Sequence, residues 1–301
     1  MIEIDVNPVV FLTIRWYGIM VALGILAMVL WVAWQVKKGA NLTYDTVFMA
    51  ALVGIPSGVV VSRLLHVVDR WDYFSQNMGQ IIGGSGLTIW GAILGATLGI
   101  WVYSKISKFR FGYLADIMAP GLILAQVIGR VGCILNGCCY GDTCDLPWAI
   151  IYSHPDSLGP LGVPVHPTQA YEIFYLLVVL VIILLLRHRL KPAGSLFILY
   201  LGFYSLWRLM VDFIRDGSPF LRNLGLEGNF FLLDMHQAQV IGIIGLLVII
   251  PALAIKTRWI KAGESYDSLL ETPPAVTEDE NNKEIIEEPP AAEPESEDNN
   301  E

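Results

Sequence analysis

Charged residues are scarce in this chain, and two signals typical of other protein classes are missing. Only 16% of its 301 residues are charged, whereas 54% are hydrophobic. This composition excludes an ordinary soluble domain and predicts an integral membrane protein. Residues 1–8 are acidic and lack the basic region of a cleavable signal peptide, so we expect the first span to insert the chain. No internal repeat is visible, which argues against an inverted-repeat transporter.

The formal charge of −9 comes from the end of the chain. Residues 263–301 hold fourteen Asp or Glu and one Lys, so residues 1–262 have a net charge of +4. The tail is rich in Glu, Pro and Asn and nearly lacks aromatic residues, so it cannot bury enough surface to fold. We therefore expect a membrane domain over residues 1–262 and a disordered acidic cytoplasmic tail over residues 263–301.

Long apolar runs predict an all-α integral membrane protein with seven transmembrane helices. Each run is about 20 residues long, the length that a helix needs to cross a bilayer. The fourth run is the least regular, because it contains Asp116 and Arg130. The predicted spans are residues 14–36, 44–66, 86–104, 113–133, 168–187, 194–214 and 235–255.

Basic residues alternate between the loops and predict the orientation. The segments after the first, third, fifth and seventh runs are basic, whereas residues 131–167 contain no Lys or Arg. Because cytoplasmic loops are enriched in Lys and Arg, we place the N-terminus outside and the C-terminus in the cytoplasm. Residues 133–166, with four prolines, then form a small extracytoplasmic cap. The glycines that precede and open the third span, residues 83–95, are best explained by close helix packing.

Arginines lie where a membrane protein rarely keeps them. Arg63, Arg130 and Arg208 each fall inside an apolar run, and Arg215 lies at the edge of one. A guanidinium in hydrocarbon costs at least about 2.5–3.5 kcal/mol and stays protonated, so such residues usually face an interior cavity. Several of them predict a site for an anion, and phosphate matches the planar fork of arginine.

The densest candidate segment is residues 129–141, which contains four glycines. Such a sequence predicts irregular backbone, which is tolerated at membrane depth only where it lines a cavity. Arg130 and Asn136 then supply a cation and an amide to that cavity. The alternative is that Arg130 only extends to the outer interface.

A second segment, residues 166–172, opens the fifth span. Thr168 is a candidate helix cap, and Thr168, Tyr171 and Glu172 share one helical face. A carboxyl in an apolar segment needs a partner, and we expect an arginine from a neighbouring span. His166 is a candidate base near neutral pH. The alternative is a purely structural helix start.

A third segment has polar residues at steps of four, four and three. Tyr204, Arg208, Asp212 and Arg215 therefore form one stripe, in which Arg208 and Asp212 are a candidate ion pair and Arg215 is available to a ligand. For Arg15, at the start of the first span, anchoring at the interface is the simplest interpretation.

Four cysteines, Cys133, Cys138, Cys139 and Cys144, fall within twelve residues on the predicted outer side. A disulfide, for example Cys139 with Cys144, fits an oxidising exterior, and free thiols remain the other possibility. A metal site is disfavoured, because adjacent cysteines do not form an easy chelate. The lack of a C-x-x-C motif disfavours a thiol oxidoreductase.

The densest segment, residues 129–141, and the second segment, residues 166–172, resemble a known family, the prolipoprotein diacylglyceryl transferases of bacteria. The strongest motifs are Gly129-Arg130-x-Gly132-x3-Asn136-Gly137-x3-Gly141 and His166-Pro167-x-Gln169-x-Tyr171-Glu172. Weaker motifs follow in matching order, and the resemblance covers about residues 10–255. The weaker motifs are Arg15-Trp16-Tyr17-Gly18, the glycine-rich third span, Tyr204-x3-Arg208-x3-Asp212-x2-Arg215 and Met235-x-Gln237.

The resemblance implies a multi-pass enzyme of the bacterial plasma membrane. Such enzymes move the diacylglyceryl group of phosphatidylglycerol to the lipobox cysteine thiol of a preprolipoprotein and release glycerol 1-phosphate. The implied partners are phosphatidylglycerol, preprolipoprotein signal peptides and membrane lipids, with no nucleic acid, metal or cofactor. By match, Arg130 and Arg208 hold the phosphate and stabilise its charge. The other implied phosphatidylglycerol-binding residues are Tyr17, Asn136, Gly141, Tyr204 and Arg215.

The chain departs from the family where the thiol is activated. Trp90 replaces a histidine that is frequent in the third span, and Cys133 and Cys138 replace an asparagine and an acidic residue. His166 or Glu172 are the candidate bases instead, unless arginine charges lower the pKa of the thiol. The alternative function is a non-catalytic protein that binds or transports an anionic lipid or solute.

Overall fold

A computed structural model describes residues 1–260 apart from 12–13, 82–87, 212–213 and 216–236. The chain divides into two units, Met1–Leu270 and Glu271–Glu301. The predicted disordered tail, residues 263–301, lies outside the described residues. So do Asp212, Met235 and the glycines at positions 83, 84 and 86.

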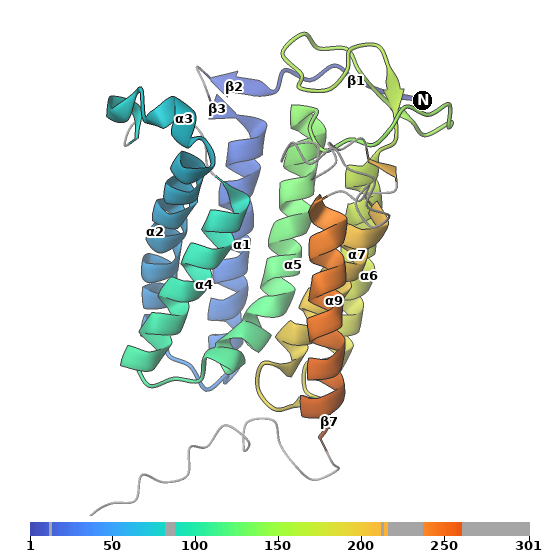
Figure 1. Cartoon of the computed structure of the whole chain (residues 1–301). Helices are drawn as coiled ribbons and strands as arrows, with labels where there is room; N and C mark the ends of the chain where they lie inside the picture. The colour runs from blue at the N-terminus through green and yellow to red at the C-terminus, as the bar shows by residue number, and fades with distance from the viewer. Residues whose placement is uncertain (12–13, 82–87, 212–213, 216–236, 261–301) are drawn as a thin grey trace, which may run out of the picture. The chain divides into compact units, whose positions relative to one another are not determined.

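Seven long helices of the described chain lie at the seven predicted spans (Figure 1). Four of them, α1, α2, α5 and α6, are long and apolar enough to cross a membrane. The other three are apolar but shorter over their described residues. Their bounds are α1 Trp16–Lys37, α2 Tyr44–Asp69, α4 Ile89–Ile106, α5 Phe111–Asn136, α6 Thr168–Leu186, α7 Ser195–Val211 and α9 Gln237–Lys256.

The helices pack side by side, with α1 against α5, α2 against α4, α5 against α6, and α7 against α9. Ile123 of α5 and Ile183 of α6 are completely buried in the largest apolar cluster. By contrast, large apolar side chains such as Phe48, Phe174 and Leu247 point outwards and are exposed. A protein with a small buried core and apolar outer faces fits hydrocarbon as its surroundings. The described chain is therefore mostly helical, and its apolar outer surface is consistent with an all-α membrane protein.

Asp116, the acidic residue of the fourth predicted span, binds the backbone at the start of α7. Its Oδ2 accepts a hydrogen bond from Gly194 N at 2.7 Å, and its Oδ1 accepts one from Phe197 N at 2.8 Å. These amides belong to the start of α7, where helical N–H groups lack partners within their own helix. A buried carboxylate in α5 therefore satisfies and orients α7, at the end away from the cap.

The glycines of α4 allow close packing against α2, as predicted. A Cβ on Gly91 would lie 2.8 Å from Ser62 N, and a Cβ on Gly95 would lie 2.6 Å from Val61 Cβ. Small residues at this spacing let two helix backbones meet directly.

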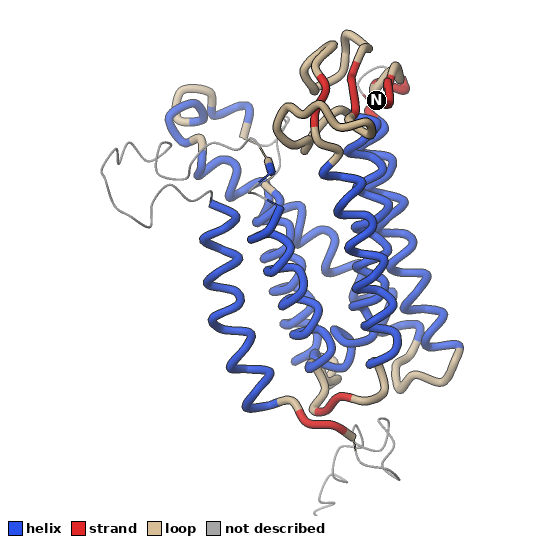
Figure 2. The backbone as a smooth tube through the Cα atoms, turned by 90° about the vertical axis from the view of Figure 1, so that its right-hand side faces the viewer, coloured by secondary structure: helices blue, strands red, loops and turns tan. Residues whose placement is uncertain are grey.

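Short strands gather at the two ends of the helices (Figure 2). At one end, β1 (Ile2–Ile4) pairs in parallel with β4 (Ile150–Tyr152), which pairs antiparallel with β5 (Pro164–Val165). Beside them lies the antiparallel pair β2 (Val9–Phe11) and β3 (Ile14–Arg15). The N-terminus and the cap therefore lie at the same end. At the other end, β6 (Leu190–Lys191) pairs with β7 (Arg258–Trp259).

Arg63 holds the segment that follows α2. Its Nε donates to Ile81 O at 2.9 Å and its Nη2 donates to Gln80 O at 2.6 Å. These bonds fix a segment made of the short helix α3 (Trp71–Phe74) and the 3-10 helix η1 (Met78–Gln80). This half-buried arginine therefore has backbone carbonyls as partners, and an anchoring role explains it.

Candidate functional site

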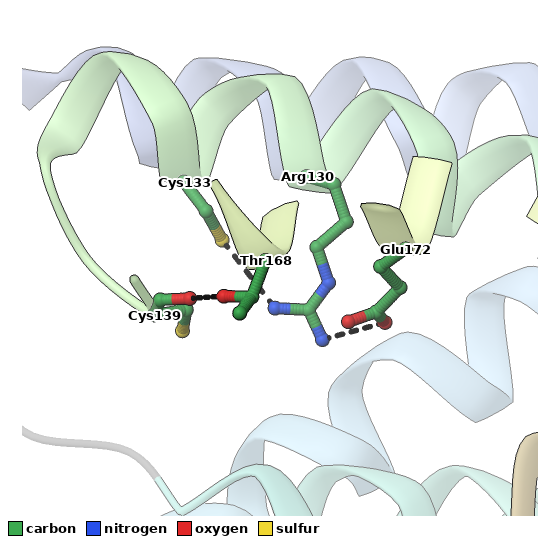
Figure 3. A network of polar contacts seen from close by, with 5 residues as sticks. All are labelled: Arg130, Cys133, Cys139, Thr168 and Glu172. Atoms are coloured by element: carbon green, nitrogen blue, oxygen red, sulfur yellow. Dashed lines mark hydrogen bonds and ion pairs between the residues drawn. The ribbon is translucent and has the colours of Figure 1, made fainter. Parts of the chain in front are cut away.

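The site centres on a buried ion pair between two helices (Figure 3). Arg130 Nη2 on α5 lies 2.8 Å from Glu172 Oε1 on α6, with side-chain exposures of 18% and 3%. The expectation that Glu172 has an arginine partner from a neighbouring span is therefore confirmed. A charge taken out of water is tolerated only with such a partner. The Nη1 atom has only a weak contact, 3.9 Å from Cys133 Sγ.

The helix that carries Arg130 ends later than predicted. Gly129 and Gly132 lie inside regular α5, so the prediction of irregular backbone is wrong for these two positions. Gly132 is needed because a Cβ there would lie 2.8 Å from Met20 Cβ of α1. The helix ends at Gly137, whose φ of 71° is left-handed, and Cys138 N then donates back to Cys133 O at 3.1 Å. Glycine is favoured in this terminating position because it has no Cβ.

Three cysteines converge just beyond this end. All four cysteines are free thiols, so of the two possibilities left open by the sequence, a disulfide such as Cys139 with Cys144 is not formed. The sulfur atoms of Cys133, Cys138 and Cys139 lie within 4.8 Å of one another. Adjacent cysteines can share this point because Cys139 has a φ of 65°, which turns the chain sharply. We refer to these three residues as the thiol cluster.

The start of α6 holds the cysteine turn. Thr168 Oγ1 donates to Cys139 O at 2.6 Å, and Gln169 Nε2 donates to Cys138 O at 2.8 Å. Both side chains are almost fully buried. Thr168 was predicted to cap α6, but Pro167 precedes the helix without a side-chain cap and the Thr168 hydroxyl serves the turn instead. A left-handed non-glycine residue costs about 1–3 kcal/mol, and these two bonds offset that strain.

The thiol cluster is surrounded by positive charge. Hydrogen bonds from Cys133 and Cys138 lower the pKa of Cys139 from its ordinary value. The charges of Arg215 and Arg130 act in the same direction, against the effect of burial. An opposite charge nearby favours the thiolate, which is the nucleophilic and metal-binding form.

Gly141 joins three segments of the site by its backbone. Gly141 N donates to His166 O at 2.9 Å, and the next residue, Asp142, donates from its N to Ile214 O at 3.0 Å. A Cβ at position 141 would lie 2.7 Å from Thr168 Cγ2 and would also collide with Ile214 O. This close approach brings the backbone of Ile214, the neighbour of Arg215, to the site. Arg215 lies beyond Val211, where α7 ends, and part of the predicted stripe from Tyr204 to Arg215 lies outside the described residues, so that stripe stays a prediction.

Asn136 links the cluster to the first helix, and Arg15 is the partner that sequence reasoning missed. Arg15 Nη1 donates to Asn136 Oδ1 at 3.2 Å, while Asn136 Nδ2 contacts Cys138 Sγ at 3.6 Å. Tyr17 is 40% exposed and lies within electrostatic range of Arg130 and the thiol cluster. Arg15 therefore contacts a site residue in addition to its predicted place at the interface. The signal available in the sequence was its place beside Tyr17.

His166 contributes its backbone more than its ring. Its Nδ1 lies 3.4 Å from the hydroxyl of Tyr171, which also accepts a hydrogen bond from Trp148 Nε1 at 2.9 Å. The predicted face of Thr168, Tyr171 and Glu172 is thus divided, with Tyr171 turned towards His166 and the cap. His166 is half-buried, one hydrogen bond away from Gly141.

Tyr204 and Arg208 lie one turn apart on α7, which packs against α5 and α6. Both are half-buried. Within the described residues neither side chain has a hydrogen bond or an ion pair. The predicted ion pair of Arg208 with Asp212 lies outside these residues, as does the side chain of Trp90.

Comparison with known proteins identifies the same family that the sequence motifs resemble. The family model described as prolipoprotein diacylglyceryl transferase matches residues 6–255. A phosphatidylglycerol–prolipoprotein diacylglyceryl transferase of Dehalococcoides mccartyi is 49% identical over 262 residues, covering 86% of this chain and 96% of the relative. Proteins of the same name from Clostridioides difficile and Lysinibacillus sphaericus are 34% and 32% identical, covering 78% and 87% of this chain and 87% and 97% of the relatives.

The family match over residues 6–255 includes the cap and the seven long helices, apart from the last residue of α9. The identity extends over nearly the full length of each relative, so the likeness is not confined to one motif. The chain belongs to the prolipoprotein diacylglyceryl transferase family.

Proposed function

We propose that this protein transfers the diacylglyceryl group of phosphatidylglycerol to the lipobox cysteine thiol of preprolipoproteins and releases glycerol 1-phosphate. Its relatives carry the name of this activity and match nearly their whole length. The observation that carries the proposal is Arg130, a half-buried guanidinium that pairs with the Glu172 carboxylate at 2.8 Å, beside a turn rich in thiols. An ionisable side chain inside an apolar bundle marks a functional site by default, and the guanidinium fork matches phosphate.

In the proposed topology, the protein crosses the bacterial plasma membrane seven times, with its N-terminus and cap outside. Support comes from the pairing of β1 with β4, which puts the N-terminus and the cap at one end. At the opposite end, Arg110, Lys191, Lys256 and Arg258 line one pocket. Basic residues collect on the cytoplasmic side of membrane proteins, so this end faces the cytoplasm.

Phosphate binding changes the partner of Arg130. In the free protein its Nη2 is held by Glu172, and its Nη1 has a long contact with Cys133 Sγ at 3.9 Å. A phosphodiester competes for the guanidinium fork and accepts two parallel hydrogen bonds from it. As the glyceryl C–O bond breaks, charge grows on the phosphate, and a fixed guanidinium stabilises it most at that moment. Arg208, which has no partner within the described residues, supplies the second cation from α7.

The remaining site residues shape the space around the phosphate. Asn136, held by Arg15, fixes the end of α5, and Gly141 allows the turn to approach α6. Arg215 adds positive charge at the rim, while Tyr17 and Tyr204 line the entry of the lipid between helices. Phosphatidylglycerol then enters from the bilayer, and the signal peptide enters from the cap side.

Two side chains are candidates for taking the proton of the thiol. Glu172 is released from Arg130 when phosphate binds, which raises its affinity for a proton. The ring of His166 faces Tyr171, so it needs a rotation to reach the same point. Glu172 is therefore the better placed of the two.

A transfer assay tests this proposal. Purified protein is placed in vesicles that contain phosphatidylglycerol and a lipobox peptide, and the diacylglyceryl-peptide is measured by mass spectrometry. Arg130→Ala is expected to lower the rate by about 10²–10³ or more, the range for removing one donor to a developing charge. Arg130→Lys keeps the charge without the fork and is expected to be intermediate.

Arg187→Ala is the matched control. Arg187 is also a half-buried arginine, but it lies at the end of α6 and donates to Gln35 Oε1 at 2.6 Å. Its loss is expected to leave the rate nearly unchanged. Unchanged activity of Arg130→Ala contradicts the phosphate role, and a wild-type protein that binds the lipid without forming product supports the binding-protein alternative.

A further inference from the structure

The proposed reaction needs a thiolate, and the residues that activate the thiol in the family are replaced in this chain. Trp90 takes the place of a histidine, and Cys133 and Cys138 take the places of polar residues. The structure puts these two replacements together with Cys139 in one cluster. Cys133 and Cys138, where the family has polar residues, therefore lie with Cys139 as three candidate ligands for one cation.

The thiol cluster has the dimensions of a metal site. Three sulfurs bound to one zinc ion at about 2.3 Å would lie roughly 3.8–4.0 Å apart. The three sulfur atoms already lie within 4.8 Å of one another, so shifts below about 1 Å complete the site. Cys133 is buried and the other two are half-buried, which leaves one side of the cluster open.

The surroundings of the cluster are fixed in advance. The carbonyls of Cys138 and Cys139 are held by the buried side chains of Gln169 and Thr168. Asn136 Nδ2 lies 3.6 Å from Cys138 Sγ, and Asn136 itself is held by Arg15. Hydrogen bonds that orient ligands and their loops are typical of built metal sites.

The charges around the cluster also fit a bound cation. Three thiolates and one divalent ion carry a net charge of −1. Arg130 Nη1 lies 3.9 Å from Cys133 Sγ, so its positive charge offsets this negative charge. Thiolate ligands select zinc and similar soft ions over magnesium or calcium.

We propose that Cys133, Cys138 and Cys139 bind a divalent thiophilic cation of the zinc type, whose fourth position takes the lipobox thiol of the substrate. This inference rests on the proposed transferase function. Catalytic zinc sites keep three protein ligands and one open position, and the cation stabilises the bound thiolate at neutral pH.

The step balances without any further reactant. The lipobox thiol loses its proton to Glu172, the base proposed above, when its sulfur binds the cation. The thiolate then attacks the glyceryl carbon that bears the phosphate ester, and a C–S bond forms as the C–O bond breaks. The electron pair of the C–O bond leaves with glycerol 1-phosphate, which Arg130 holds. The oxidation state of the cation does not change.

Cobalt binding tests the site independently of activity. The full-length protein is purified in detergent, reduced, freed of metal with a chelator and titrated with Co²⁺. We expect one Co²⁺ per chain, with a sulfur-to-cobalt charge-transfer band and the visible bands of a tetrahedral ion, and displacement by Zn²⁺. Cys133→Ser and Cys139→Ser are expected to lose these bands. Cys144→Ser is the matched control, because Cys144 lies outside the cluster, and it should keep them.

A second measurement tests the fourth position. Arg130→Ala loaded with Co²⁺ in detergent without phosphatidylglycerol has no diacylglyceryl donor, so a lipobox peptide added to it stays intact. A change in the visible bands with the cysteine peptide, and none with a serine peptide, supports the proposal. Absence of charge-transfer bands in the reduced wild-type protein overturns it, and so does full activity of the metal-free enzyme. If wild type binds Co²⁺ but makes no diacylglyceryl-peptide, the metal site stands and the transferase function fails.

Discussion

Glycine has different structural roles in two glycine-rich regions of this protein, helix α4 and the turn after α5. In α4, Gly91 and Gly95 lie in a regular helix, and their missing side chains let the backbone of α2 approach. After α5, Gly137 and Gly141 lie outside regular structure, where one ends a helix and the other lets three segments meet. The first region is an apolar helix contact, and the second is a polar turn.

The difference lies in the partners that surround the glycines. Around α4 they are aliphatic or small residues such as Val61 and Ser57. Around the turn they are hydrogen-bonding groups from α6 and charged groups from α5. Small residues in an apolar helix pair therefore indicate packing, whereas glycines next to arginine, asparagine and cysteine indicate a site. Substitutions in each region measure this contrast.

The largest expected effect comes from the ion pair beside the turn. Glu172→Ala leaves the Arg130 guanidinium buried without a countercharge, and loss of one partner of a buried pair costs about 3–5 kcal/mol. We expect a marked fall in thermal unfolding temperature, measured in detergent. The double variant Arg130→Met/Glu172→Met should recover most of the stability and show no transfer activity. A double variant as unstable as Glu172→Ala would show that the pair does not act as a unit.

The next effect concerns the geometry of the turn. Gly141→Ala forces a Cβ against Thr168 Cγ2 and the backbone of Ile214, so the turn must move away from α6. A displacement of about 1 Å at a reacting centre can lower activity roughly 100-fold. Transfer assays should show this loss with little change in unfolding temperature. Gly79→Ala, where a Cβ meets nothing within 4 Å, is the control for both measurements.

In the apolar region the same kind of change should act on stability. Gly95→Ala places a Cβ 2.6 Å from Val61 Cβ and against the backbone of Ser57, so α2 and α4 must separate. Overpacking of this kind costs about 1–3 kcal/mol. We expect a lower unfolding temperature and, in the folded fraction, a normal rate of transfer. If Gly95→Ala instead abolishes activity at full stability, α4 belongs to the site rather than to the packing.

The helices and the ion pair could be predicted because their signals are local or obligatory. Apolar runs of about 20 residues indicate spans wherever they occur. A carboxyl such as Glu172 must find a partner inside an apolar bundle, so an arginine was expected before its position was known. The packing role of the α4 glycines followed from the spacing of small residues along an apolar run.

The thiol cluster could not be predicted, because it depends on a single backbone angle. The φ of 65° at Cys139 turns two adjacent side chains towards Cys133, and left-handed cysteines are rare. The contact between Arg15 and Asn136 joins residues 121 positions apart, and the bond from Thr168 reaches Cys139 O rather than its own helix. Local propensity says nothing about such long-range partners.

The smallest expected effect is on stability, and it differs between two glycines of α5. It tests whether a glycine inside a regular helix can also belong to the site. Gly129 and Gly132 both lie in α5 beside Arg130, yet a Cβ on Gly129 meets nothing within 4 Å, whereas a Cβ on Gly132 meets Met20 Cβ at 2.8 Å. Gly129→Ala should therefore stabilise the helix by about 0.5–1 kcal/mol through a smaller loss of backbone entropy. Gly132→Ala should destabilise the contact between α1 and α5 instead.

Unfolding temperatures of the two variants check the signs, and the transfer rate of Gly129→Ala checks whether position 129 takes part in the site. Slower transfer by a stabilised Gly129→Ala would mean that the lipid passes over this face of α5, and that a glycine can serve the site without bending the backbone.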